Sequence, residues 1–363
     1  MLSAAAFHRR WKGGWRGTTS VPRIPAAVLL PTLTAALIAG MLLAIGIGAV
    51  RIAPEQVVAI ILHHAGIDLD VEYTHQQAAI VWAIRLPRVL TAILVGSALA
   101  VSGAALQGMF RNPLADPGLI GVSSGAALGA VASVALGMSW LGIATMPVCA
   151  FLGGMATAVT VYFLSRHHGR TEIVTLVLTG IALNTFAGAG TGLLTYIASD
   201  QQIRAVVFWS LGSLGSATWR GVLVTLPFVA IGLVAAPRWG PVLNLFVLGE
   251  REARHLGVDT ERVRLELIFL TALMTGAAVA VAGVVGFVGL IVPHLIRLAG
   301  PDHRVLLPAS ALGGAAMLLL ADLAARTVAA PAELPLGVVT ALIGGPFLLV
   351  LMLRTRKAHG GWG

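Results

Sequence analysis

The chain has 363 residues, of which 57% are hydrophobic and only 11% are charged. Soluble domains carry about 25% charged residues, so the composition excludes a soluble globular protein and predicts an all-α polytopic membrane protein. The formal net charge of +9 would suggest nucleic-acid binding in a soluble chain, but in a membrane protein basic residues first report loop orientation.

Apolar stretches separated by charged or Pro/Gly-rich breaks predict about ten membrane elements in one domain, residues 26–357. In chain order they are Ala26–Val50, Leu86–Gln107, Leu119–Gly137, Leu141–Leu164, Ile173–Ala198, Gly221–Ala236, Leu265–Val285, Phe287–Leu298, Leu306–Ala325 and Leu336–Leu353. A short apolar piece, Ile203–Leu211, follows the fifth span, and the short stretch Phe287–Leu298 is counted as a crossing. Residues 1–25 and 358–363 are predicted to be tails.

The distribution of Lys and Arg orients these elements. With the N-terminus inside, 18 of the 24 basic residues fall in inside segments. The six outside are Arg51, Arg85, Arg88, Arg204, Arg220 and Arg326. Because excess Lys and Arg marks cytoplasmic loops, both termini are predicted to be cytoplasmic, and the positive charge needs no nucleic-acid partner.

Two segments of the chain resemble each other weakly. Residues 96–113 align without gaps on residues 276–293, and six of the eighteen positions are identical. The identities are Gly96/Gly276, Ala98/Ala278, Ala100/Ala280, Val101/Val281, Gly103/Gly283 and Pro113/Pro293. The predicted topology runs the first copy inward and the second outward, and inverted repeats of this kind are typical of transporters.

The sequence contains no familiar catalytic motif. Neither of its two lysines, Lys12 and Lys357, lies in a phosphate-binding G-x-x-x-x-G-K-[ST] loop. His63, His64 and His75 share an outer loop with acidic residues, where a solvated polar loop is favoured over a metal site. The chain is therefore predicted not to be an enzyme and to bind no metal or cofactor itself.

The predicted spans hold few ionisable residues, which argues against an ion-coupled secondary transporter, the alternative of another class. Asp322 has Arg326 four residues later, a spacing that predicts a local ion pair. Asn184, in the middle of a span, could line a polar pathway or bond a neighbouring helix. His294 is expected to be a structural hydrogen-bonding group.

Residues 238–264 form the longest inside connection between spans. They contain the helix-prone stretch 248–258, with charges on one side and Leu248, Ala253 and Leu256 available for docking. From composition alone, a partner-binding helix and a solvated loop helix are equally supported.

Six motifs, in order, resemble the permease subunits of the type II ATP-binding-cassette importers for iron chelates, haem and vitamin B12. They are Arg85-Leu-Pro-Arg88; RNPLADPGLIGVSSG within residues 96–125; Phe208-Trp209 with Gly212-Ser213; LGEREARHLGV; GFVGLIVPH at 286–294; and Glu333-Leu-Pro-Leu-Gly337 with Gly345-Pro-Phe347. The resemblance covers the chain from about residue 80 onward but not its first 25 residues.

The resemblance implies a homodimer of ten-helix subunits in a bacterial inner membrane. It also implies two ATPase subunits inside, which bind the ATP and Mg, and a soluble periplasmic substrate-binding protein outside. The segment matching the ATPase-coupling helices contributes Leu248, Gly249, Glu250, Arg251, Ala253, Leu256 and Gly257. Arg85, Arg88 and Arg326 match outer arginines that pair with the binding protein, and Asn112 and Leu114 match a cytoplasmic gate.

Within this family, the run RNPLADPGLIGVSSGAALG is most similar to haem-import permeases. Haem is flat, apolar and doubly anionic, so a wide apolar pathway with arginines at its mouth suits it, and Arg204 could serve there. Ferric siderophores and cobalamin would suit the same pathway and remain alternatives.

Overall fold

The computed structural model describes residues 24–167, 170–300 and 302–358. In these ranges the chain is helical apart from loops and a two-stranded hairpin, β1 (Arg166–His167) with β2 (Arg170–Thr171). Eight helices are long and apolar enough to cross a membrane, and two shorter apolar helices accompany them. The prediction of an all-α polytopic protein with about ten membrane elements is therefore confirmed. Most of the predicted N-terminal tail and residues 359–363 lie outside the described ranges.

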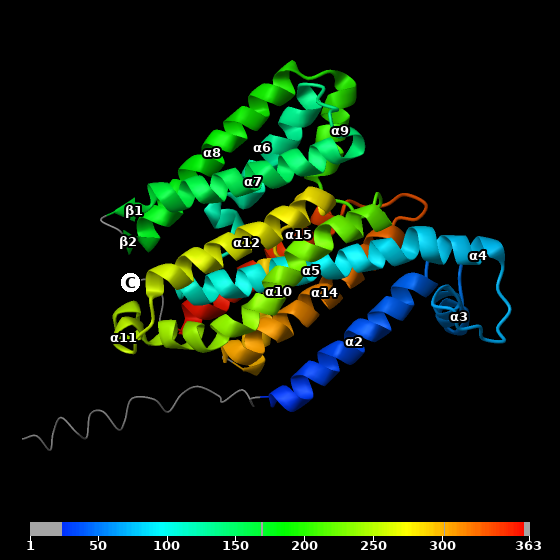
Figure 1. Cartoon of the computed structure of the whole chain (residues 1–363), viewed down its shortest axis with the longest axis horizontal. Helices are drawn as coiled ribbons and strands as arrows, with labels where there is room; N and C mark the ends of the chain where they lie inside the picture. Colours follow the sequence, from blue (N-terminus) through cyan, green and yellow to red (C-terminus); the bar gives the residue numbers. More distant parts are fainter. Residues whose placement is uncertain (1–23, 168–169, 301, 359–363) are drawn as a thin grey trace, which may run out of the picture.

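The helices alternate in direction along one long bundle (Figure 1). The first half contains α2 (Ala26–Gly46), α3 (Pro54–His64), α4 (His75–Ala79), the π-helical η1 (Ile80–Arg85), α5 (Leu86–Phe110), η2 (Pro117–Ile120), α6 (Val122–Ala135), η3 (Gly142–Ala144), α7 (Thr145–Leu164), α8 (Ile173–Ile197) and α9 (Asp200–Ser210). The second half contains α10 (Trp219–Leu248), α11 (Glu250–His255), α12 (Thr260–Ala282), α13 (Val288–Ala299), α14 (His303–Thr327) and α15 (Leu336–Ala358).

Two spans are longer than predicted. The span expected to end at Ala236 continues as α10 to Leu248, with Pro237 and Pro241 inside it. Proline removes one backbone donor but is tolerated in membrane helices where neighbouring groups satisfy the freed carbonyl. The second span begins much earlier than Leu86, since helix runs without a break from His75 to Phe110.

The centre of the bundle consists of α5 and α12, while α2, α8 and α15 lie at its periphery. Glycines allow α5 to pack this closely: a Cβ at Gly96 would collide with the Gly314 carbonyl of α14, and one at Gly103 with the Gly289 carbonyl of α13. Small residues at such contacts let helix backbones approach closely where the hydrophobic effect gives no help.

The two halves follow the same order of elements. In each half a long central helix, α5 or α12, precedes a short helix, α6 or α13, that starts after a residue in the left-handed conformation, Gly121 or Phe287. Helices of one half pack against helices of the other, since α5 contacts α14 and α12 contacts α7. The order of elements agrees with an inverted repeat, but the register of the sequence alignment differs, because it pairs residues 103–107 inside α5 with residues 283–287 between α12 and α13.

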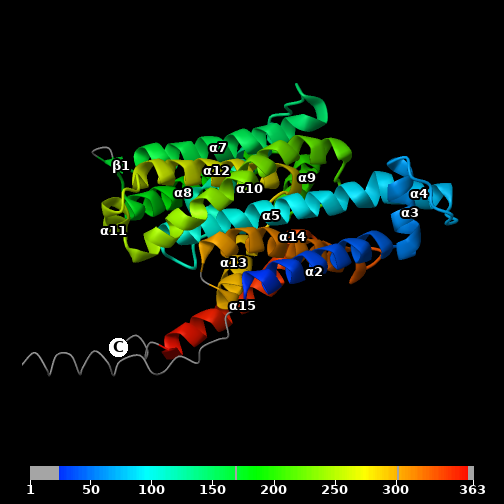
Figure 2. The ribbon, with the colours of Figure 1, turned by 60° about the horizontal axis from the view of Figure 1, so that its bottom comes forward.

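The bundle has two distinct ends, visible at left and right in Figures 1 and 2. We call the end with α11 and the β1–β2 hairpin the α11 end, and the end with α3 and α4 the α3 end. Residues 249–259, which are predicted to be inside, lie at the α11 end, whereas the C-terminus of α2 and the N-terminus of α5 lie at the α3 end.

Candidate functional site

The segment predicted to couple to an ATPase is a short helix between two spans. Gly249, with φ 132°, separates α10 from α11, and the Glu252 carboxylate would collide with any Cβ placed there. Gly257, with φ 86°, ends the turn after α11. Both values lie in the region that only glycine adopts readily, so these two glycines set the sharp path of the segment.

The side chains predicted for docking divide into two groups. Leu248, Arg251 and Leu256 are exposed, and Leu256 retains 61% of its accessible surface. Ala253 is wholly buried, so its expected direct contact with a partner is wrong in this structure: its methyl group packs α11 onto the bundle. The predicted segment 238–264 is likewise shorter as a connection, because residues 238–248 belong to α10 and residues 260–264 to α12.

Glu250 points inward and joins a charged cluster that we call the Arg264 network: Thr171, Glu250, Arg254, Thr260, Glu261 and Arg264. The Arg264 side chain is 1% exposed. Its Nη2 lies 3.0 Å from a Glu250 oxygen, and its Nη1 donates to the Thr171 carbonyl at 2.7 Å and to Glu261. Charge-assisted bonds of this kind are stronger than neutral ones, so the network fixes α11 to α12 and to the hairpin.

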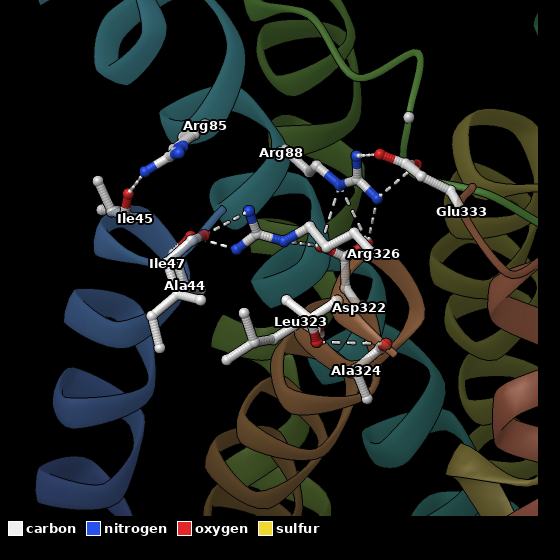
Figure 3. Close-up of polar contacts among 12 residues, drawn as sticks. Ala44, Ile45, Ile47, Arg85, Arg88, Asp322, Leu323, Ala324, Arg326 and Glu333 are labelled. Carbon is white, nitrogen blue, oxygen red and sulfur yellow. Dashed lines mark hydrogen bonds and ion pairs between the residues drawn. The ribbon is translucent and has the colours of Figure 1, made fainter. Parts of the chain in front are cut away.

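At the α3 end, Arg85 and Arg326 hold the C-terminus of α2 (Figure 3). Arg85 donates to the carbonyls of Ile45, Gly46 and Val50. Arg326 donates to those of Ala44 and Ile47. The last carbonyls of a helix have no partner within the helix and carry partial negative charge. The two guanidinium groups satisfy these carbonyls from α14 and from the helical segment that leads into α5.

Arg88 completes this group, which we call the α3-end arginines: Arg85, Arg88 and Arg326. Arg88 bonds to both oxygens of Asp322 at 3.0–3.1 Å and to both oxygens of Glu333 at 2.9–3.0 Å. The expected local pair of Asp322 with Arg326 is thus only partly right. Arg326 Nε lies 3.8 Å from an Asp322 oxygen, and the main partner of Asp322 comes from α5.

Glu333 is the accessible member of this cluster, with 46% of its side chain exposed. The hydrogen bond from Arg88 lowers the pKa of Glu333, so this carboxylate is ionised at neutral pH. All three arginines that sequence comparison assigns to a partner protein therefore already have partners within this chain, and their docking role remains a prediction.

Asn112 and Leu114 lie in the exposed loop between α5 and η2 at the α11 end. The Asn112 side chain accepts the Leu114 backbone N–H at 2.9 Å, which shapes the turn. Two residues further, burial raises the pKa of Asp116, and the Gly118 N–H partly offsets the effect. The structure places the predicted gate residues together, while their gating role stays a prediction.

Asn184 is used inside the chain. Its Nδ2 donates to the Gly118 carbonyl at 2.9 Å, so it joins α8 to η2, as one of the two sequence interpretations expects. Arg204 is exposed on α9. His294 differs from expectation: its Nδ1 has no hydrogen-bond partner among the described residues, and its ring packs edge-to-face on Phe347.

The outer histidines are part of a folded cap. His63 and His64 end α3, His63 bonds to Asp68, and His64 stacks on Trp82 with 3.8 Å between ring centroids. Among the described residues, no group of three or more His, Cys, Asp or Glu side chains is arranged to hold a metal ion.

The centre of the Arg264 network is the part of this site that sequence reasoning misses. In the sequence Arg264 is one of several inside basic residues, and nothing draws attention to Thr171. The i,i+3 spacing of Glu261 and Arg264 at the start of a span is a usable signal, because a charged pair there has to be held by neighbouring segments.

Comparison with known proteins agrees with this arrangement. The FecCD transport family model matches residues 36–354. The hemin transport system permease protein HmuU of Yersinia pestis is 51% identical over 286 residues, 77% of this chain and 84% of that protein. The cobalamin import system permease protein BtuC of Halobacterium salinarum is 47% identical over 77% of this chain and 74% of its own length.

The fold has a solved counterpart as well. An inward-facing ABC transporter assigned to the metal-chelate type superposes with a TM-score of 0.79 and 34% identity, covering 90% of this chain and 98% of that one. The family model and the solved structure each match most of this chain. The long central helices and the short α11 between two spans agree with that match. The chain belongs to the FecCD transport family and is an ABC importer permease.

Proposed function

We propose that this chain is the membrane subunit that moves haem from a periplasmic binding protein into the cytoplasm. Two copies would enclose the pathway at their shared axis, and two ATPase subunits would bind at the α11 ends and hydrolyse ATP with Mg. This orientation places both termini on the cytoplasmic side of the bacterial inner membrane.

The observation that carries the proposal is the exposed surface formed by α11 and the residues that flank it. Leu248, Arg251 and Leu256 project from a segment that is held against α12 by the Arg264 network. An exposed apolar patch with a charge beside it suits a protein partner. Because α11 is held rigidly against the central helix α12, a partner that displaces α11 would also displace α12.

The α3 end would receive the binding protein. The expectation of an acidic partner rests on Arg88 and not on net charge, because the α3 end also carries the exposed carboxylates Glu55, Asp68, Asp70 and Glu72. Arg88 is the candidate for direct contact because its bond to the half-exposed Glu333 can be exchanged for one to a partner carboxylate. Arg85 and Arg326 would contribute indirectly, by holding the C-terminal end of α2 in place beside the docking surface.

We prefer haem as the substrate because the hemin permease HmuU is 51% identical to this chain, whereas the cobalamin permeases are 47% and 42% identical. Cobalamin and ferric siderophores are the alternatives within the family. Asn112 and Leu114 are proposed as the cytoplasmic gate, with Arg204 near the outer mouth.

Reconstitution with the cognate ATPase and binding protein tests the function. We expect ATP-dependent uptake of haem into proteoliposomes, with cyanocobalamin and a ferric siderophore as competing substrates. If cobalamin alone is taken up, cobalamin and not haem is the substrate. Uptake that needs no ATPase and follows a proton or sodium gradient would contradict the importer itself.

The docking face has its own test. Replacing Arg251 and Leu256 together by Ala removes the exposed contacts without touching buried Ala253, and we expect at least a ten-fold loss of ATPase co-purification. Replacing the exposed Val174 and Leu178 of α8 by Ala is the matched control. Unchanged co-purification of the Arg251/Leu256 variant would remove α11 from the interface.

A further inference from the structure

One charged side chain joins three segments that meet at the α11 end. Arg264, in the first turns of α12, bonds to Glu250 of α11, to Glu261 of its own helix and to the carbonyl of Thr171 in β2. β2 leads directly into α8, which begins at Ile173. A single guanidinium therefore connects the segment between α10 and α12 to the connection between α7 and α8.

The rest of the network reinforces this junction. Glu261 also accepts the Thr171 backbone N–H at 3.1 Å and its hydroxyl at 2.9 Å. Glu250 also accepts from Arg254 at 2.9 Å. Every strong contact between the hairpin and α12 in this cluster thus passes through Glu261 or Arg264.

Because Arg264 is buried, its contacts are difficult to break. With 1% of its side chain exposed, the guanidinium cannot exchange its partners for water without opening the junction, because burying an unpaired charge costs several kcal/mol. Its Nε has no partner among the described residues, so within that part of the chain the two carboxylates and the Thr171 carbonyl supply all of its compensation.

α11 depends on this junction for its position. It has only six residues, and a helix of this length is not stable by itself in water. Apart from its covalent ends, α11 is held to the bundle by the buried Ala253 methyl, by the Glu250–Arg264 pair and by a 3.5 Å bond from the Thr260 hydroxyl to Glu250.

We infer that Arg264 is the positioning residue that makes α11, the β1–β2 hairpin and α12 move as one body when an ATPase subunit displaces α11. The inference rests on the proposed function for the identity of that partner. Displacement of α11 reaches the start of α8 through the Thr171 contact and the central α12 through its own backbone. Without Arg264, α11 shifts on its flexible glycines, Gly249 and Gly257, and the core does not follow.

The test compares Arg264→Met with Arg262→Met, a matched control two residues away whose side chain is 76% exposed. In proteoliposomes with the ATPase and binding protein, we expect Arg264→Met to keep ATPase binding and hydrolysis but to lower transport per ATP at least ten-fold. Arg262→Met keeps the wild-type ratio. Arg264→Lys recovers part of it, since an ammonium keeps the charge but cannot make all three contacts. A wild-type ratio in Arg264→Met overturns the inference.

If Arg264→Met does not reach the membrane, Glu250→Gln decides instead, because it weakens the bonds from Arg264, Arg254 and Thr260 at a half-buried site without leaving a buried charge unpaired. A reduced transport per ATP with normal ATPase binding supports the inference, and an unchanged ratio overturns it.

A second arm uses the permease alone. Spin labels at Val174→Cys and His255→Cys, in a Cys149→Ser background, report the distance between the start of α8 and α11. We expect a narrow distribution that broadens in Arg264→Met and stays narrow in Arg262→Met; equal widths overturn the mechanical link. If no ATPase binds even the wild-type chain, the proposed function fails, while this arm still decides whether Arg264 joins the segments.

Discussion

The two charged clusters at opposite ends of the bundle are built differently. At the α3 end, three arginines face two carboxylates, and the surplus charge is taken up by backbone carbonyls at the C-terminus of α2. In the Arg264 network, two arginines face two glutamates. The comparison teaches that the first cluster, with one arginine more than carboxylates, stabilises a helix end, whereas the second is neutral and joins segments.

The largest expected effect is at Asp322, which is 2% exposed and compensates Arg88 and Arg326. Asp322→Asn leaves Arg326 without a carboxylate and Arg88 with Glu333 alone, and breaking a buried pair in this way costs about 3–5 kcal/mol. Unfolding in mixed micelles with increasing denaturing detergent measures the loss. Asp70→Asn, at an exposed loop position, is the control and should stay within about 0.5 kcal/mol.

Next in size is Arg326→Met, which leaves the Ala44 and Ile47 carbonyls without their donors. Water can replace the exposed bond to Ile47, so the cost comes mainly from the partly buried Ala44 carbonyl, and an unsatisfied buried polar group costs about 1–3 kcal/mol. Because the loss is local to the end of α2, hydrogen exchange should speed up at residues 43–50 and remain unchanged in α12. Uniformly faster exchange would show that the cluster supports the whole bundle and not one helix end.

In the Arg264 network, Glu261→Gln should cost about 1–2 kcal/mol, since a neutral amide weakens charge-assisted bonds to Arg264 and Thr171. The change should not add to that of Arg264→Met, because residues in one network are coupled. A double-mutant cycle measures this coupling, and additive effects would contradict a shared network. Glu172→Gln is the control, because among the described residues the Glu172 side chain bonds only to Thr175.

The smallest effect belongs to Glu333, whose bond to Arg88 is half-exposed and should contribute no more than about 1 kcal/mol. Its pKa is lowered in the folded state by the Arg88 hydrogen bond. The contribution is therefore fully present above the unfolded pKa of about 4.3 and is lost as the pH falls through the lower folded pKa. The difference in unfolding free energy between wild type and Glu333→Gln should be present at pH 7 and shrink below about pH 4. A difference that does not change with pH would contradict ionisation as its source.

The membrane elements could be predicted because each is a long apolar stretch with clear breaks. Two bounds differ: helix begins at His75 and not at Leu86, and α10 runs through Pro237 and Pro241. Local rules end a helix at such prolines, although a bundle can satisfy the freed carbonyl. The exposed docking residues follow from their pattern, but the burial of Ala253 does not, because it depends on how α11 sits against the bundle.

The partners of the arginines could not be predicted from local sequence patterns, because they lie far away in the sequence. Arg88 and Asp322 are 234 positions apart, and Arg264 and Thr171 are 93 apart. Only the packing of distant helices brings them together, whereas local patterns assign each residue no more than a charge and a side of the membrane.

The close glycine contacts of α5 determine where this protein can vary. Substitution at Gly96 or Gly103 would drive a side chain into the backbone of α14 or α13, whereas a Cβ added at Gly188 or Gly192 of α8 would meet no neighbouring atom within 4 Å. Within one subunit, therefore, α8 has room for new side chains at these two positions, whereas α5 has none at Gly96 or Gly103.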